Sequence, residues 1–325
     1  MAEITAAKDD IDTGNPLTIA EAYGKVFIAN KDKLRVVDFI NVKLTLSALT
    51  DPPAHGDILT QNQGGSDNAF MVVDYVNAAK TLIYGHAYYG GDATAFDTSN
   101  TVSSDDTTAV MNGATFTPTT VTNPPHWYTW TAYPDCVDAG SVTLDYGDIP
   151  NQATLVCNYR GRVCLSGNPE LPYQWFQPRQ ANPWDWSYLS TDAQAAVRGG
   201  SSDAGEIGDS VTALVPYKDD FLVFGCVSTI WYLAGDAREG GSILELDLTT
   251  GIYGPLALCF DGEGYLWFWG TNGLYKTSSP AQLNNAPGKP ICISEITLPD
   301  LVKDEAVDPS VYRIVLTYDR RRAGI

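Results

Sequence analysis

Ala213-Leu-Val-Pro-Tyr-Lys-Asp-Asp-Phe-Leu-Val-Phe-Gly225 joins two short apolar segments through a polar turn, which is the pattern of a β-hairpin. Similar stretches recur at 18–30, 153–167, 256–270 and 311–325. The residues that enter the five turns are Tyr23, Tyr159, Tyr217, Asp261 and Tyr318, and the last three intervals are 58, 44 and 57 residues. A single hairpin cannot bury its apolar face alone, so this repeat predicts stacked units, as in a β-propeller or a similar array.

Further strands follow the hairpins. Phe221–Phe224 is followed by Ile230–Leu233, and Tyr265–Phe268 by Leu274–Lys276, with Asn272-Gly273 at the turn. Asn-Gly is the strongest short hairpin signal. Each repeat therefore supplies three to four strands, as a propeller blade requires, and the predicted fold class is an all-β propeller.

An insertion separates the first two repeats. Tyr23 and Tyr159 lie 136 residues apart, far beyond the other intervals. The stretch 51–122 has no Trp and is rich in Asp, Thr, Gly and Asn, yet Ala69–Val76 and Lys80–His86 have strand patterns on either side of a turn at Asn77. Asp57–Leu59 and Gly113–Phe116 are expected to pair with them. The interpretation is a small β-domain that projects from the first blade; a disordered polar excursion is the alternative.

The predicted organisation has three parts: first propeller strands in 1–50, an inserted β-domain in 51–122, and the remaining blades in 123–325. Residues 191–210 are polar and Gly-rich, which predicts a loop with one short helical turn at 193–198. At the C-terminus, a strand at Val311–Thr317 and a turn at Tyr318 leave the return strand only begun at Ile325. We therefore expect either a continuing chain or a strand from another chain to complete the last blade.

Composition restricts the function classes. The chain has 325 residues, of which 18% are charged, and a net charge of −19. This charge does not favour binding of nucleic acid through phosphates, which needs clustered Lys and Arg. The simpler explanation of the acidic composition is that it keeps the protein soluble. The functional explanation is that the acidic surface forms a channel wall past which DNA slides.

The six cysteines are too few for a disulfide scaffold in a chain of this length. Cys157 and Cys164 flank one turn and are placed to face each other. Buried free thiols are the favoured interpretation, and a disulfide between these two cysteines is the alternative. There is no signal region and no apolar run long enough to span a bilayer, which predicts a soluble protein made in a cytoplasm.

No catalytic, cofactor or metal residues are predicted. His55, His86 and His126 lack partners at metal-ligand spacing, and phosphate-binding Gly loops and Gly-x-Ser-x-Gly are absent. Three acidic pairs lie in polar turns, where Asp supplies turn geometry: Asp145 with Asp148, Asp219 with Asp220, and Asp261 with Glu263. Trp231, Trp267 and Trp269 lie in apolar strands and are expected in the core, whereas Trp184 and Trp186 are interface candidates.

Residues 150–280 carry a resemblance. One blade of the tailed-phage propellers is resembled by three consecutive segments, Arg162–Glu170, Tyr173–Pro178 and Asn182–Tyr188. The next blade is resembled by Val211–Gly225 together with Ile230–Asp236. Ile252–Pro255 with Asn272–Tyr275 resembles the one after. These proteins are the tail nozzle, hub or stabilisation proteins of short-tailed phages.

The resemblance implies a virion structural protein without catalytic residues or cofactors. It implies a homo-oligomeric ring, commonly of six subunits, that contacts tail adaptor and tail fibre proteins and surrounds the channel through which the genome is ejected. Two alternatives come from other classes: a propeller that binds or cleaves glycans of the host surface, and a cytoplasmic propeller that serves as a protein-interaction scaffold.

Overall fold

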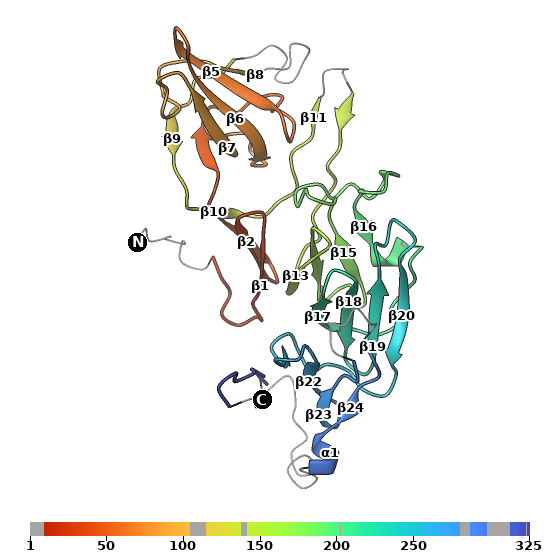
Figure 1. The fold of residues 1–325 in the computed structure, drawn as a ribbon. Helices are drawn as coiled ribbons and strands as arrows, with labels where there is room; N and C mark the ends of the chain where they lie inside the picture. Colours follow the sequence, from red (N-terminus) through yellow and green to blue (C-terminus); the bar gives the residue numbers. More distant parts are fainter. Residues whose placement is uncertain are drawn as a thin grey trace.

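The computed structural model describes residues 10–104, 115–137, 142–201, 203–279, 287–297, 313–322, 324 and 325. Within these ranges the fold is all-β, with four four-stranded antiparallel sheets, one six-stranded sheet and one two-stranded sheet. Figure 1 shows the six-stranded sheet at one end of the molecule, the fourth four-stranded sheet at the other end, and the remaining four-stranded sheets between them.

The four-stranded sheets share one design, in which consecutive hairpins form an up-and-down order. The first sheet contains β1 (Thr18–Ala22), β2 (Lys25–Asn30), β3 (Lys33–Asp38) and β10 (His126–Thr129). The second contains β13 (Leu155–Tyr159), β14 (Arg162–Ser166), β15 (Trp175–Gln177) and β16 (Val197–Arg198). The third contains β17 (Val211–Tyr217), β18 (Phe221–Cys226), β19 (Ile230–Ala234) and β20 (Ser242–Asp247). The fourth contains β21 (Leu258–Phe260), β22 (Leu266–Gly270), β23 (Gly273–Lys276) and β24 (Ile291–Cys292).

These sheets confirm the predicted hairpins at Tyr23, Tyr159, Tyr217 and Asp261, each of which forms the first two strands of its own sheet. The turn chemistry explains two of them. Tyr23 and Gly24 have φ angles of 53° and 67°, and Arg160 and Gly161 have 50° and 67°. Two consecutive left-handed residues match the right-handed twist of the flanking strands, so these short turns hold each pair of strands in register.

A tyrosine at the end of the first strand links each of the first three sheets to the next. The Tyr23 hydroxyl donates to the Gly161 carbonyl at 2.5 Å. The Tyr159 hydroxyl donates to the carbonyls of Asp220 and Gly235 at 3.1 and 2.8 Å, and the Tyr217 hydroxyl donates to the Ser279 carbonyl. The tyrosines that mark the repeat in the sequence are therefore inter-sheet hydrogen-bond donors.

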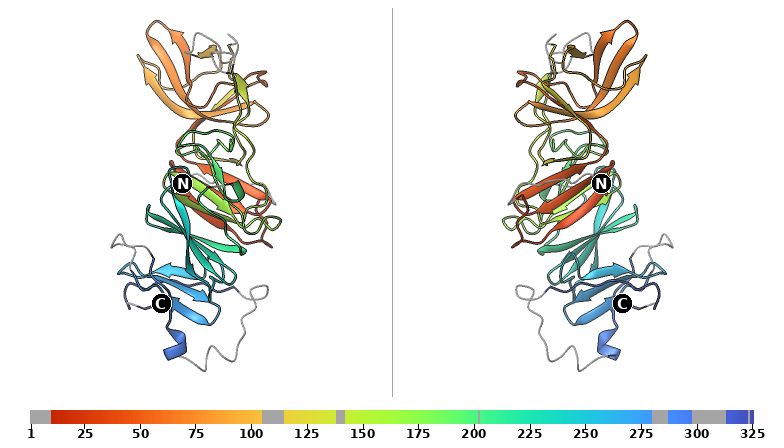
Figure 2. Two further views of the ribbon diagram at one scale, coloured as in Figure 1. Left: turned by 90° about the vertical axis from the view of Figure 1, so that its right-hand side faces the viewer. Right: turned by 90° about the vertical axis from the view of Figure 1, so that its left-hand side faces the viewer.

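Threonines make similar links at the other end of two of these strands. Thr18 Oγ1 donates to the Thr154 carbonyl at 2.8 Å and accepts from the Val156 N–H at 2.9 Å. Thr212 Oγ1 donates to the Ile252 carbonyl at 2.5 Å. Because both ends of these first strands are tied to the following sheet, neighbouring sheets stand side by side (Figure 2).

The inserted sheet follows the order β8-β5-β6-β7-β4-β9. Its strands are β4 (Val42–Thr45), β5 (Ile58–Gly64), β6 (Asp67–Val76), β7 (Leu82–Gly90), β8 (Val102–Ser104) and β9 (Thr120–Thr122). It begins at Val42 and not at the predicted boundary of 51, because β4 pairs with both β7 and β9. Phe116 pairs with Val102 of β8 and not with the β6–β7 hairpin; Gly113 and Ala114 lie outside the described residues.

The inserted sheet is not a separate peripheral element, because it shares one apolar core with the first sheet. Tyr75 of β6 stacks on Trp184 with ring centroids 4.4 Å apart, and Tyr84 of β7 lies 4.4 Å from Tyr128 of β10. Phe27 of β2 contacts Trp130 at 4.8 Å. Burial of these large rings against one another makes the insertion continuous with the main body.

The burial of the tryptophans differs from what the sequence predicts. Trp184 and Trp186 are 0% exposed, whereas Trp231, Trp267 and Trp269 are only partly buried. Alternation along β22 explains the last two, because Leu266 and Phe268 take the buried positions and Trp267 and Trp269 point to the other face. Trp184 and Trp186 lie in a segment outside named strands, where strand patterning gives no indication of burial.

Two other predicted segments differ in the structure. The 191–210 stretch contains β16 and a 3₁₀ helix at Gly199–Ser201, so it supplies the outer strand of the second sheet and not only a loop. Near the C-terminus, residues 313–317 have no strand assignment; Leu316 N–H donates to the Leu256 carbonyl at 2.9 Å, and Asp319 forms a bridge with Gly324. Val311 and Tyr312 lie outside the described residues.

The remaining elements are the two-stranded sheet of β11 (Cys136–Val137) and β12 (Thr143–Leu144) and the helix α1 (Ser294–Thr297). In the described ranges, no helix is long and apolar enough to cross a membrane.

Candidate functional sites

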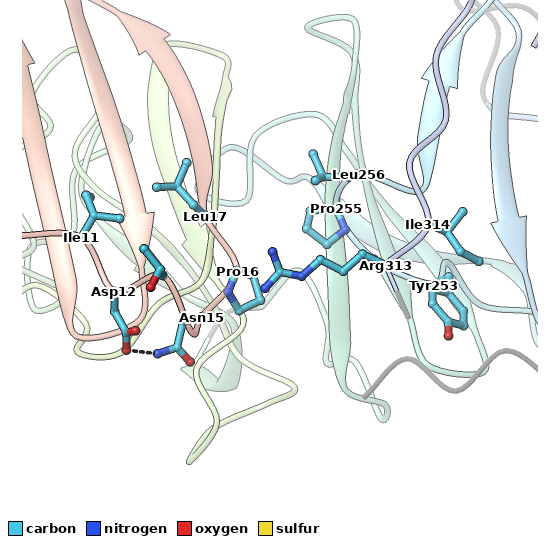
Figure 3. Close-up of a pocket in the computed structure, with 12 residues that line it drawn as sticks. Ile11, Asp12, Asn15, Pro16, Leu17, Tyr253, Pro255, Leu256, Arg313 and Ile314 are labelled. Carbon is cyan, nitrogen blue, oxygen red and sulfur yellow. Dashed lines mark hydrogen bonds between the residues drawn. The ribbon is translucent and has the colours of Figure 1, made fainter. Parts of the chain in front are cut away.

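An apolar cleft lies between the segment that precedes the first sheet and the segment that precedes the fourth (Figure 3). Its volume is about 490 Å³. Ile11, Pro16 and Leu17 line one side, and Pro255 and Leu256 line the other. Figure 3 shows Arg313 extending across the cleft toward Pro16. The lining is mainly apolar, and its charged groups are the Asp12 carboxylate and the Arg313 guanidinium.

A second cavity of about 410 Å³ shares Leu17, Pro255 and Leu256 with this cleft. It is lined by residues of β1, β13 and β17, together with the segment that precedes β21. The first strands of three sheets and the approach to the fourth therefore face one groove, which we call the axial groove. Asn158 Nδ2 donates to the Glu21 carbonyl at 3.3 Å across it, so β1 and β13 are joined along its wall.

A polar cleft of about 610 Å³ lies between the β4–β5 connection, β12 with the residues that follow it, and the connection from β15 to β16. The side chains that give it its chemistry are those of His55, Asp145, Tyr146, Arg179, Asn182 and Asp185. Burial raises the pKa of Asp185, against the opposing effects of the Ser187 N–H and the Arg179 guanidinium. Arg179 Nη1 lies 3.8 Å from Asp185 Oδ2, so the cleft holds a guanidinium beside a carboxyl group.

Asp74 contacts His55, one of the residues that line this cleft. Lys25 Nζ is 2.8 Å from Asp74 Oδ2, His55 Nε2 is 3.7 Å from Asp74 Oδ1, and Trp184 Nε1 donates to Oδ1 at 3.2 Å. Although burial opposes ionisation, the nearby His55 side chain and the charge of Lys25 hold the pKa of Asp74 well below its usual range. The carboxylate stays charged and ties the insertion to the first sheet.

The sequence did not indicate this cluster. In the sequence His55 has no partner at metal-ligand spacing, and Asp74 belongs to no motif. No local motif connects them with Lys25, because they lie on three separate segments that only the folded chain brings together. The strand irregularity between Val73 and Tyr75 places Asp74 at the junction.

Two of the three predicted acidic pairs lie at turns, Asp219 with Asp220 between β17 and β18 and Asp261 with Glu263 before β22, whereas Asp145 and Asp148 have no turn assignment. Asp261 Oδ1 accepts from the N–H groups of Glu263 and Tyr265, each at 2.9 Å, and Oδ2 accepts from Trp267 Nε1 at 2.8 Å. Asp145 Oδ1 accepts from the Gly147 N–H at 2.8 Å. Asp261 is therefore a hydrogen-bond acceptor that holds its own turn, while Asp145 also lines the polar cleft.

All six cysteines are free, and Cys157 faces Cys164 across β13 and β14. The hydrogen bond between the two thiols, together with burial, raises the pKa of Cys157 well above its ordinary value. Over the described ranges, no group of three or more His, Cys, Asp or Glu side chains is arranged to hold a metal ion.

Comparison with known proteins adds little. No protein-family model matches the chain, and no curated protein is significantly similar to it. One solved structure with a weak likeness is PorZ, an essential bacterial surface component of the type-IX secretion system of Porphyromonas gingivalis. The match has 12% identity and a TM-score of 0.26, and it covers 92% of this chain and 44% of PorZ. At this TM-score the likeness carries no argument about function.

Proposed function

We propose that the chain is a structural β-propeller-type subunit of a phage tail nozzle or hub. One observation carries the proposal: four sheets of the same up-and-down order stand side by side, and the first strands of three of them face the axial groove. Propeller blades have this order and this placement of their first strands. The resemblance of residues 150–280 to tailed-phage propellers supplies the virion context.

The charge is consistent with this role. A net charge of −19 disfavours attachment to DNA phosphates, so a genome passes such a wall without being held. The partners of this subunit are copies of itself in a ring, commonly of six, together with tail adaptor and tail fibre proteins. The subunit requires no cofactor.

Native mass spectrometry and negative-stain imaging of the purified chain test the proposal. We expect a closed ring of identical copies and no retention of double-stranded DNA in a gel-shift assay at physiological salt. A chain that remains monomeric at every concentration, or one that binds DNA tightly, contradicts it.

A glycan-binding or glycan-cleaving propeller is the second candidate, and the polar cleft with Arg179 and Asp185 is the observation that favours it. A carboxyl of raised pKa is the group that protonates a glycosidic oxygen in glycosidases. Binding or turnover of a bacterial surface polysaccharide that is lost in Asp185→Asn, but kept in the exposed-turn variant Asp319→Asn, would favour this candidate over the structural one.

A further inference from the structure

The polar cleft contains three buried side chains that keep a hydrogen-bonding atom without a partner among the described residues. Asn182, Asp185 and Ser187 are 7%, 8% and 8% exposed. Asn182 Oδ1 accepts from the Trp184 N–H at 3.1 Å, and Asp185 Oδ1 accepts from the Ser187 N–H at 2.9 Å. Asn182 Nδ2, Asp185 Oδ2 and Ser187 Oγ make no hydrogen bond to the described part of the chain, and none of them is sealed from solvent. Because buried polar atoms normally have partners, these three atoms are available to a ligand in the cleft.

The segment that carries these side chains is held in place by its own contacts. Trp184 and Trp186, on either side of Asp185, are 0% exposed and belong to the apolar core. The Asp185 carbonyl accepts from the Arg179 N–H at 2.8 Å, and the Trp186 N–H donates to the Tyr146 carbonyl at 2.7 Å. Groups that are fixed before binding lose little conformational entropy when a ligand arrives, so this segment is suited to recognition.

The charges beside these atoms already have partners, which disfavours an ionic ligand. The Arg179 guanidinium donates to both carboxylate oxygens of Asp192, at 3.1 and 2.9 Å, and lies 3.8 Å from Asp185 Oδ2. His55 Nε2 lies 3.7 Å from Asp74 Oδ1. An anionic ligand would have to displace Asp192 from the guanidinium, and a cationic ligand beside Asp185 would meet the guanidinium itself. A neutral, polar ligand avoids both costs.

A ligand with several hydroxyl groups matches the free atoms. A hydroxyl both donates and accepts, whereas an amide nitrogen donates and a carboxylate oxygen accepts. The cleft therefore offers a donor at Asn182, an acceptor at Asp185 and a hydroxyl of either kind at Ser187. Two exposed residues add to this set: Asp145 offers a further acceptor, and Leu189, which is 86% exposed, offers apolar surface to C–H groups. The volume of about 610 Å³ lies within the range of about 300–1,000 Å³ that is usual for small-molecule sites.

We propose that the polar cleft is a binding site for a neutral saccharide, whose hydroxyl groups are held by Asn182, Asp185 and Ser187. Asn182 Nδ2 donates to one hydroxyl, Asp185 Oδ2 accepts from another, and Ser187 Oγ bonds a third, while the C–H groups of the ring contact Leu189. The inference rests on the second candidate function for its class of ligand and deepens it, because it specifies a neutral ligand, its contacts and reversible binding without cleavage. It does not require the chain to form a ring.

A printed array of neutral, anionic and cationic glycans, probed with the labelled full chain, tests the class of ligand. We expect the bound glycans to be neutral. The affinity of the best glycan is then measured in solution by isothermal titration calorimetry. Ser187→Ala removes one hydrogen bond and should weaken binding about fivefold. Asp185→Asn places a donor where an acceptor is needed and should weaken it at least about tenfold.

Ser99→Ala is the matched control. The Ser99 N–H donates to Asp97 Oδ1 at 2.7 Å, which is the same local bond that Ser187 makes to Asp185, but Ser99 is exposed and does not line the cleft. This variant should bind the glycan as the wild type does. If thermal denaturation shows that Asp185→Asn disturbs the fold, Ser187→Ala decides the test, because it keeps the backbone N–H that bonds Asp185.

The proposal is overturned if no neutral glycan binds, or if Ser187→Ala binds the glycan as tightly as Ser99→Ala does. Preferential binding of anionic or cationic glycans overturns the assignment of a neutral ligand. Release of reducing sugar that Asp185→Asn abolishes overturns reversible binding in favour of cleavage. Native mass spectrometry of the same sample reports the ring separately, so a ring without glycan binding rejects this site and leaves the proposed tail function standing.

Discussion

The four-sheet array and the inserted sheet are held in place by different interactions. Neighbouring sheets of the array share apolar cores and carry, in addition, hydrogen bonds that recur at equivalent positions, from Tyr23, Tyr159 and Tyr217 to carbonyls of the next sheet. The inserted sheet is joined to the first sheet by the stacked rings of Tyr75 and Tyr128 and by the ion pair between Lys25 and Asp74. The array thus repeats the same tyrosine hydrogen bond between successive sheets, whereas the inserted sheet is attached at a single junction.

This difference has an energetic consequence. A net hydrogen bond contributes about 1 kcal/mol, so loss of one link in the array leaves the others in place. Buried aromatic side chains and buried charges contribute several kcal/mol each and act together. We therefore expect single substitutions at the junction to be more destabilising than single substitutions in the array.

The largest expected effect is that of Trp184→Ala. Trp184 is fully buried, stacks on Tyr75 and donates to Asp74, so its removal leaves a cavity and takes one hydrogen-bond donor from the Asp74 carboxylate. The free energy of unfolding should fall by about 3–5 kcal/mol, as measured by urea denaturation. Trp269→Ala, at a partly exposed ring, is the matched control and should cost clearly less. If both variants lost the same free energy of unfolding, the junction would contribute no more to stability than the array.

The next effect concerns Asp74 and pH. Its pKa is lowered in the folded state, so its ionised form stabilises the fold above the unfolded pKa of about 3.9, and this stability is lost as the pH falls through the folded pKa. Asp74→Asn should cost roughly 2–3 kcal/mol at pH 7, because Lys25 stays buried without its partner. The variant should also lose stability less steeply than the wild type below about pH 4.

Denaturation curves at pH 7, 4 and 3 check this, with Asp319→Asn as an exposed-carboxylate control. Parallel declines of the wild type and Asp74→Asn on the acid side would show that the Asp74 carboxylate does not stabilise the junction.

The smallest expected effect is that of Tyr159→Phe, which removes one link of the array. Tyr159 is buried, and the carbonyls of Asp220 and Gly235 would lose their hydroxyl donor. The cost should be about 1–2 kcal/mol in urea denaturation. Tyr173→Phe, at an exposed ring, should be neutral. A cost as large as that of Trp184→Ala would erase the contrast between the array and the junction.

Local pattern in the sequence determined the elements of the array. The turns at Tyr23-Gly24 and Arg160-Gly161 and the alternation of apolar residues depend on interactions between neighbours in the chain, so these hairpins are predicted at their observed positions. The turn between β22 and β23 is Thr271-Asn272 and not the predicted Asn272-Gly273, because Gly270 pairs with Gly273. The sequence also marked the repeated tyrosines, although not their function as donors to the next sheet. That function depends on which carbonyl lies opposite, and spacing alone does not give it.

Tertiary structure alone decided the junction and the binding surfaces. Lys25, His55 and Asp74 lie on three separate segments, and Trp184 and Trp186 occupy a stretch outside named strands, so no short-range pattern reports their burial or their contacts. Among the described residues, His86–Gly90 of β7 pairs only with β6, because β4 begins at Val42, opposite Gly85. Pairing between strands distant in the chain creates such features, and a linear pattern carries information only about neighbours along the chain.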